Sequence, residues 1–223
     1  MAADWKSVVT SGAFLGCALS AVMLVIGCVL AQVFGKKLSS SNKLVLVWIA
    51  FDIMTHLFMD TPYFVLFYLH GPKFLEKSNN FYTRICKEYG NIDKRVLTAD
   101  PGLMAILLFT CVACVPLEII LFNAIIKDKS YRHTVQTLVA GICIFGAWMY
   151  VVPELLVGSP NLSGDLVSLL VFFGLAVLYL VVPHLLLYQS IQEIPSGTRQ
   201  VHTVTKTETQ TVRRSQRIRK KAE

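Results

Sequence analysis

The chain has 223 residues, of which 54% are hydrophobic and only 16% are charged. Soluble domains carry about 25% charged residues, so this composition argues against an ordinary soluble globule, and the length excludes a large multidomain assembly. The net charge of +7 is unevenly distributed, because residues 195–223 hold eight Lys and Arg against two Glu, whereas the rest of the chain is close to neutral. We therefore expect no binding of nucleic acid by the apolar body.

Five stretches are long and apolar enough to cross a bilayer, for which about 20 apolar residues suffice. They are residues 8–34, 44–70, 102–126, 134–157 and 166–194. The first stretch is longer than the apolar core of a cleavable signal peptide and lacks a strong positive flank, so we expect it to remain as an anchor. The sequence thus predicts an all-α membrane protein, a bundle of five transmembrane helices.

The distribution of Lys and Arg in the short loops predicts the orientation of the bundle. The first and third loops hold three of these residues each, the C-terminal tail holds eight and the loop at 158–165 has none, whereas the loop at 71–101 dissents with six Lys and Arg against four acids. We therefore expect a lumenal N-terminus and a cytosolic C-terminus. The loop at 71–101 would then be lumenal, and its balanced charge and aromatic residues predict a folded lid at the membrane interface.

Three regions follow from this organisation. Residues 1–39 hold the N-terminus and the first helix, residues 40–194 hold the other four helices, and residues 195–223 are predicted to be a disordered basic tail. The tail places Lys220 and Lys221 four and three positions from the end, which is the pattern of a dilysine retrieval signal of the endoplasmic reticulum. Chance occurrence in a basic tail, or attraction to anionic lipid, is the alternative.

The second stretch holds the densest set of ionisable residues. Asp52, His56 and Asp60 recur every four residues and therefore share one helical face, with the hydroxyl of Thr55 beside them. Ionisable groups in the bilayer cost free energy and are functional hypotheses by default. The stripe predicts a polar wall of an internal ligand pocket; a hydrogen-bonded ladder that joins helices is the simpler alternative.

Prolines followed by polar residues interrupt the other stretches. Glu118 follows Pro116, and the pairs Pro153–Glu154 and Pro183–His184 repeat this pattern. Proline kinks a helix, so these regions are expected to be irregular and to leave room for a cavity, although each polar residue alone is best explained by an interhelical contact. The aromatic residues expected to line the cavity are Trp48, Trp148, Tyr150 and Tyr179. The alternative role, that of an interfacial anchor, is the one expected for Trp5.

The remaining motifs are weak. Cys111 and Cys114 have the spacing of a redox or metal pair, but they lie inside an apolar stretch with no second pair. Buried thiols usually act as small hydrophobes, so the sequence predicts no metal site and no cofactor. Asn161 begins a glycosylation sequon that we expect to lie too close to the membrane to be used.

Several segments resemble the emopamil-binding protein family, the sterol-isomerase-like proteins with an EXPERA domain, and most closely its emopamil-binding protein-like branch. The segments are 48–64 (WIAFDIMTHLFMDTPYF), 87–100 (KEYGNIDKRVLTAD), 124–136 (AIIKDKSYRHTVQ), 145–162 (FGAWMYVVPELLVGSPNL) and 179–189 (YLVVPHLLLYQ). The resemblance implies a five-helix bundle with a pocket for a sterol or an amphiphilic amine, and possible homodimerisation. Active members of the family move a sterol double bond from the Δ8 to the Δ7 position without a redox cofactor.

The resemblance carries over to this chain only in part. The family's histidine and glutamate pair falls on His56 and Asp60, which would be the catalytic residues of an active enzyme. The family's glutamate in the third span falls on Leu107, and its asparagine and tryptophan in the fifth span fall on Ala176 and Tyr179. Loss of a positioned catalytic group commonly lowers rates by orders of magnitude.

Glu118 is not expected to replace the missing acid, because the eleven residues from Leu107 span roughly 16 Å along a helix axis. The favoured hypothesis is a sterol-binding protein of the endoplasmic reticulum with weak or no isomerase activity. The alternatives are an active cholestenol Δ-isomerase that uses His56 and Asp60, and a lipid transporter or interaction protein.

Overall fold

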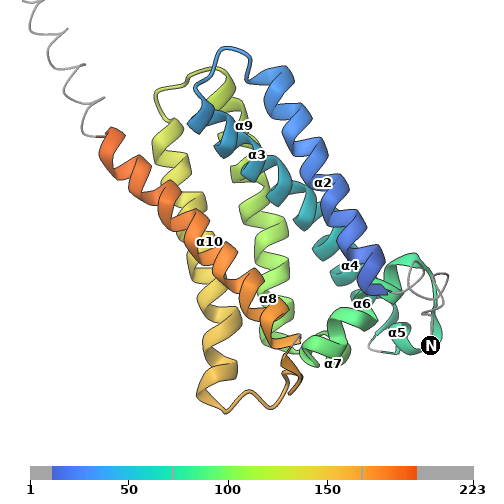
Figure 1. Ribbon diagram of the computed structural model, residues 1–223. Helices are drawn as coiled ribbons and strands as arrows, with labels where there is room; N and C mark the ends of the chain where they lie inside the picture. The colour runs from blue at the N-terminus through green and yellow to red at the C-terminus, as the bar shows by residue number, and fades with distance from the viewer. Residues whose placement is uncertain (1–11, 72, 167, 195–223) are drawn as a thin grey trace, which may run out of the picture.

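The computed structural model describes residues 12–71, 73–166 and 168–194 (Figure 1). Within these ranges, the helices long and apolar enough to cross a membrane are Phe14–Phe34, Ser40–His70, Pro101–Ile126, Arg132–Leu156 and Ser168–Ile194. The prediction of an all-α protein with five candidate spans is therefore confirmed. The predictions made for Trp5, for Lys220 and Lys221, and for the tail at 195–223 lie outside the described residues.

Two of the five long helices are divided by a π-helical turn. The second consists of α3 (Ser40–Thr55), the turn η1 (His56–Asp60) and α4 (Thr61–His70). The third consists of α8 (Pro101–Phe109), the turn η2 (Thr110–Cys114) and α9 (Val115–Ile126). The first helix is α2 (Gly12–Phe34), the fourth is α10 (Arg132–Leu156), and the helix Ser168–Ile194 is the fifth.

Each π turn lies just before a proline. In the two turns the backbone N–H of Thr61 bonds the carbonyl of His56, and that of Val115 bonds the carbonyl of Thr110, which are i→i+5 bonds. Pro62 and Pro116 have no N–H and crowd the carbonyl four residues earlier, so a wider turn relieves the helix there. The two turns contact each other, because the hydroxyl of Thr61 lies 2.9 Å from the Cys111 sulfur.

The core of the bundle lies between α3, α9, α10 and the fifth helix. Leu46, Ile49, Leu121, Val139 and Leu186 pack together there and are buried. Helix α2 packs on α3 and leaves much of its apolar surface exposed, as Val22 and Val25 illustrate. Exposed apolar surface of this extent is what a lipid environment would cover.

Three short helices connect α4 to α8 and gather at one end of the bundle (Figure 1). They are α5 (Phe74–Lys77), α6 (Phe81–Ile92) and α7 (Arg95–Thr98). Asn80 caps α6 by accepting a hydrogen bond from the Thr83 N–H. The chain after α6 joins the loop that follows α10, because the N–H of Lys94 donates to the Asn161 carbonyl at 2.9 Å and that of Ser163 to the Ile92 carbonyl at 2.9 Å.

Candidate functional site

The three ionisable residues of the second span lie together at the junction of α3 and η1. His56 is buried, and its Nδ1 lies 2.6 Å from an Asp60 oxygen while its Nε2 lies 3.5 Å from an Asp52 oxygen. The Asp52 side chain is fully buried, whereas that of Asp60 retains 24% exposure. Since both ring nitrogens face carboxylates, the imidazole is held in one orientation between them.

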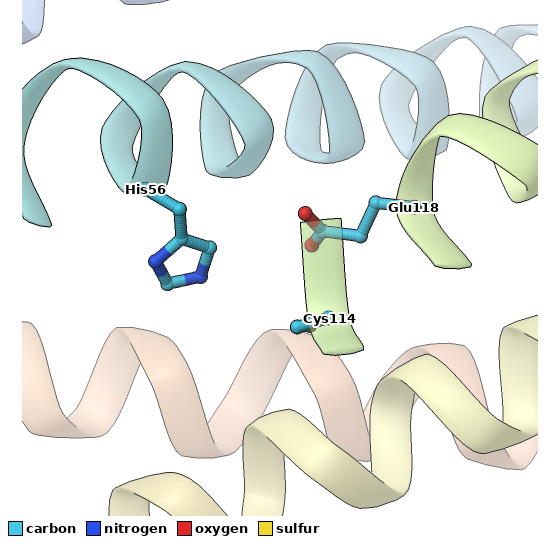
Figure 2. A group of neighbouring side chains, drawn as sticks. All are labelled: His56, Cys114 and Glu118. Carbon is cyan, nitrogen blue, oxygen red and sulfur yellow. The ribbon is translucent and has the colours of Figure 1, made fainter. Parts of the chain in front are cut away.

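The turn η2 and the helices α9 and α10 bring three further groups to this stripe, namely Cys114, Glu118 and Cys143. The Cys143 thiol donates to Asp52 at 3.7 Å, and the Cys114 sulfur lies 4.0 Å from the Cys143 sulfur. Figure 2 shows the carboxylate of Glu118 directed toward the ring of His56, with Cys114 beside it. We name this group the His56 cluster; its members are Asp52, His56, Asp60, Cys114, Glu118 and Cys143.

Glu118, like Cys114 and Cys143, is a member of the His56 cluster that the sequence did not predict. It is fully buried, and neither of its carboxylate oxygens has a hydrogen-bond partner within the part of the chain that the structure describes. Its potential ligand atoms and those of His56 and Cys114 all lie within 4.8 Å of one another. The signal in the sequence was a lone carboxylate in an apolar stretch, which is costly unless it has a role.

The chemistry of the His56 cluster follows from its charges. Three carboxylates and one imidazole share a site that is largely sealed from water, and like charges this close cannot all be ionised at low cost. Protons are therefore shared among them, which is the property that general acid–base chemistry requires.

Two surface hollows of about 430 Å³ each lie outside the His56 cluster. Residues such as Tyr68 and Met104 line the first, and residues such as Leu138 and Phe145 line the second. The internal ligand pocket stays a prediction.

The other residues predicted to bind a ligand are dispersed. Tyr179 is partly buried, packs edge-on against Trp48 at a ring distance of 5.3 Å, and lies within electrostatic reach of Asp52. Thr55 lies beside the stripe and donates its hydroxyl proton to the Phe51 carbonyl at 3.0 Å. Trp148 is 54% exposed on α10 and is not part of the His56 cluster.

Tyr150 belongs to a second buried group, which we name the Arg95 cluster. The Arg95 guanidinium forms bonds of 2.7 and 3.0 Å with the two Asp93 oxygens, donates to the Tyr150 carbonyl at 3.0 Å, and lies 4.7 Å from the centre of the Tyr150 ring. The Tyr150 hydroxyl donates to Asp93 at 2.8 Å and lies 2.7 Å from the Tyr89 hydroxyl. The members of the cluster are Tyr89, Asp93, Arg95, Tyr150 and Glu154.

The titration of this cluster reflects its burial and its pairing. Burial lowers the pKa of Arg95, but the hydrogen bonds and the negative charge of Asp93 outweigh that effect and leave the pKa above its usual value. Burial raises the pKa of Tyr89 to about 12. Arg95 therefore stays charged and Tyr89 stays neutral, so the cluster fastens α6, α7 and α10 together.

The sequon residue Asn161 is attached to the same end of the bundle. Its side-chain amide donates to a Glu154 oxygen at 2.8 Å, and the Arg95 Nε lies 3.5 Å from that same oxygen. Glycosylation needs this amide nitrogen free and accessible. The hydrogen bond to a buried carboxylate thus adds a second reason, besides nearness to the membrane, to expect that the sequon is not used.

The fold and these buried polar groups describe a helical membrane protein, and comparison with known proteins specifies its relatives. Residues 81–190 match the family model described as EXPERA (EXPanded EBP superfamily). The chain is 25% identical over 182 residues to a probable 3-beta-hydroxysteroid-Delta(8),Delta(7)-isomerase of Arabidopsis thaliana, covering 81% of this chain and 77% of the relative. It is 27% identical over 148 residues to an isomeliandiol synthase of Ailanthus altissima, covering 66% of this chain and 69% of the relative.

A third relative agrees with the first. It is a probable 3-beta-hydroxysteroid-Delta(8),Delta(7)-isomerase of Oryza sativa subsp. japonica, 24% identical over 160 residues, and the match covers 71% of each chain. These matches confirm the predicted resemblance to the emopamil-binding protein family. The family-model match includes Glu118, Cys143 and the Arg95 cluster but begins after the stripe formed by Asp52, His56 and Asp60.

Proposed function

We propose that this chain is a multi-pass protein of the endoplasmic reticulum membrane that binds sterols or related amphiphiles and has weak or no Δ8–Δ7 isomerase activity. The observation that supports this proposal concerns Leu107, the position at which the resemblance places the family's glutamate of the third span. Leu107 packs in an apolar cluster with buried Tyr63 and Leu103, so no acid stands there. A lumenal N-terminus and a cytosolic C-terminus are part of the proposal and are supported by the positions of Lys and Arg in the loops.

The contacts that His56 and Asp52 make within the His56 cluster support the same proposal. Both ring nitrogens of His56 face carboxylates, and Asp52 also accepts the thiol proton of Cys143. A sterol alkene must approach the proton donor to within bonding distance before a proton can move. Proton transfer from His56 to an alkene would first have to break one of these contacts, whereas the oxygens of Glu118, which have no hydrogen-bond partner among the described residues, are available to the polar end of an amphiphile.

One observation favours active isomerisation as a second candidate. Glu118 is buried beside His56 and its oxygens have no hydrogen-bond partner among the described residues. In this reaction a proton would add to one alkene carbon, a carbocation would form, and a proton would leave the neighbouring carbon. His56 with Asp60 would hold and move the proton, and the remaining carboxylates would stabilise the cation in a site of low dielectric.

The test is complementation of a yeast strain that lacks its own Δ8–Δ7 isomerase, read by the composition of its sterols. We expect Δ8 sterols to persist while the same membranes bind a radiolabelled sterol saturably. Restored Δ7 sterol, abolished by His56→Ala, would overturn the proposal in favour of the active isomerase. Absence of any saturable binding would overturn it in favour of a lipid transporter or an interaction protein.

A matched pair of variants tests whether the missing acid at position 107 is the reason for weak or absent isomerase activity. If the acid at position 107 is what limits the reaction, Leu107→Glu should produce Δ7 sterol in this strain, whereas the similarly sized Leu107→Gln should not. Membrane levels of both variants are measured by immunoblot, because a polar side chain in the apolar cluster around Tyr63 lowers stability. Equal Δ7 sterol from the two variants would contradict the assignment of an acid role to this position.

A further inference from the structure

The two cysteines of the His56 cluster form a pair that the spacing of the sequence does not suggest. Cys114 does not pair with Cys111, three residues earlier in the sequence; its sulfur lies 4.0 Å from that of Cys143 on α10. Cys111 instead contacts the hydroxyl of Thr61. Two zinc–sulfur bonds of about 2.3 Å at a tetrahedral angle put their sulfurs roughly 3.8 Å apart, so the spacing of Cys114 and Cys143 suits a shared zinc ion.

Two more metal-binding side chains complete the set. The ligand atoms of His56, Cys114 and Glu118 lie within 4.8 Å of one another, and so do those of Asp52, Glu118 and Cys143. Glu118 is common to both triads and directs its carboxylate toward the others (Figure 2). Through this shared carboxylate, His56 and Cys114 of one triad and Cys143 of the other supply the imidazole and thiolate ligands of a four-coordinate site.

The oxygens without partners point to a ligand in this space. Both oxygens of Glu118 and one oxygen of Asp52 are buried and have no hydrogen-bond partner among the described residues. Buried carboxylates are normally hydrogen-bonded, paired with a cation or bound to a metal. The ion pairs of Asp52 and Asp60 are both with His56, so the Glu118 carboxylate is the group of the cluster that a bound cation would satisfy.

We propose that His56, Cys114, Glu118 and Cys143 bind one zinc ion inside the helix bundle. Magnesium and calcium disfavour thiolate ligands, and a mixed set of imidazole, thiolate and carboxylate is typical of zinc. The two thiols release their protons when the ion binds, so two thiolates and the Glu118 carboxylate surround a doubly charged ion and a neutral imidazole completes the set. This inference does not depend on the proposed sterol ligand.

His56 is already arranged as a zinc ligand. Its Nδ1 lies 2.6 Å from Asp60, which leaves Nε2 to face Glu118 and Cys114 (Figure 2). Metal-binding histidines commonly hydrogen-bond a carboxylate through their second nitrogen, and loss of that carboxylate typically weakens metal binding about 10- to 100-fold. Asp60 would therefore be a positioning residue of the site, and Asp60→Asn should weaken zinc by this factor without abolishing it.

The experiment uses the full chain, purified in detergent under reducing conditions, with metal counted by mass spectrometry and cobalt as the optical probe. Cobalt bound to thiolates gives an intense near-ultraviolet charge-transfer band. We expect one zinc per chain and this band in the wild type, and loss of both in Cys114→Ser and Glu118→Gln. Cys111→Ser is the matched control, because Cys111 lies in the same π turn outside the cluster, and it should bind metal as the wild type does.

Thermal unfolding without metal checks that each variant is folded. Zinc should raise the midpoint of the wild type and of Cys111→Ser but not that of Cys114→Ser. Absence of stoichiometric zinc in the folded, reduced wild type would overturn the proposal. An unchanged cobalt band in Cys114→Ser and Cys143→Ser would overturn it equally, since the metal would then be bound elsewhere. These readouts contain no sterol, so their failure is distinct from failure of the proposed function.

Discussion

The Arg95 cluster and the His56 cluster are both buried, yet their polar atoms are satisfied to different degrees. In the first, the charge of Arg95 meets Asp93 in a two-pronged contact, and hydroxyls and carbonyls fill the remaining positions. In the second, three carboxylates surround one imidazole, and the oxygens of Glu118 have no hydrogen-bond partner among the described residues.

This difference distinguishes a cluster that stabilises the fold from a cluster that is a candidate for function. A buried charge with a complete set of partners stabilises one packing of the helices around it. A buried charge without partners lowers stability, and it persists where a ligand or a reaction uses it. The Arg95 cluster thus joins the short helices to α10, whereas the His56 cluster is the candidate site.

Removal of Arg95 should give the largest loss of stability. Arg95→Ala leaves Asp93 buried without its cation, and breaking a buried pair in this way costs about 3–5 kcal/mol. The measurement is the free energy of unfolding in detergent, by denaturant titration. Lys94→Ala is the control, because the neighbouring Lys94 side chain is exposed, and it should change stability by less than about 0.5 kcal/mol. Equal losses in the two variants would show that the Arg95 cluster does not hold this end together.

Replacement of Glu118 should have the opposite sign. In metal-free protein, Glu118→Met removes a buried carboxylate whose oxygens have no hydrogen-bond partner among the described residues, so the free energy of unfolding should rise by about 1–3 kcal/mol. Glu154→Met is the matched variant in the Arg95 cluster, and it should destabilise the protein because the amide of Asn161 loses its acceptor. A loss of stability in both variants would mean that Glu118 has a structural role like that of Glu154.

The comparison also shows what the sequence can and cannot predict. The five spans follow from runs of apolar residues, and the stripe from Asp52 to Asp60 follows from a spacing of four within one helix. The irregularity predicted at Pro116 is present as the π turn η2 just before it. These features depend on residues close together in the chain, where helical geometry alone sets the arrangement.

The rest of the site depends on how separate helices align. Glu118 lies roughly 16 Å along the helix axis from Leu107, the position of the family's acid, because eleven residues separate them in one span. His56 lies on another helix, at the level of Glu118 and Cys114 rather than at the level of Leu107. Cys114 and Cys143 are likewise 29 residues apart in sequence and belong to different spans, yet their sulfurs lie close together. No periodicity within a single helix contains this information.

The sequon provides a smaller test of how complete the Arg95 cluster is. We expect the chain expressed in a eukaryotic cell to show no change in electrophoretic mobility after glycosidase treatment, because the Asn161 amide is bonded to Glu154. Asn161→Ala should lower the free energy of unfolding by about 1 kcal/mol through loss of that bond. A mobility shift in the wild type that Asn161→Gln removes would show that the loop opens far enough to be modified.

The smallest expected effect is a pH dependence that belongs to the Arg95 cluster alone. Burial raises the pKa of Tyr89 from its ordinary 10.0 to about 12, so the folded chain keeps a proton that the unfolded chain releases. The stabilising contribution is therefore fully present below pH 10 and is lost as pH rises toward 12. Unfolding measured across this range should show a decline in stability that is less steep in Tyr89→Phe than in the wild type. Tyr131→Phe is the control, because Tyr131 is 46% exposed, and it should leave this slope unchanged. An equal change of slope in both variants would mean that burial does not raise the pKa of Tyr89 in the folded chain.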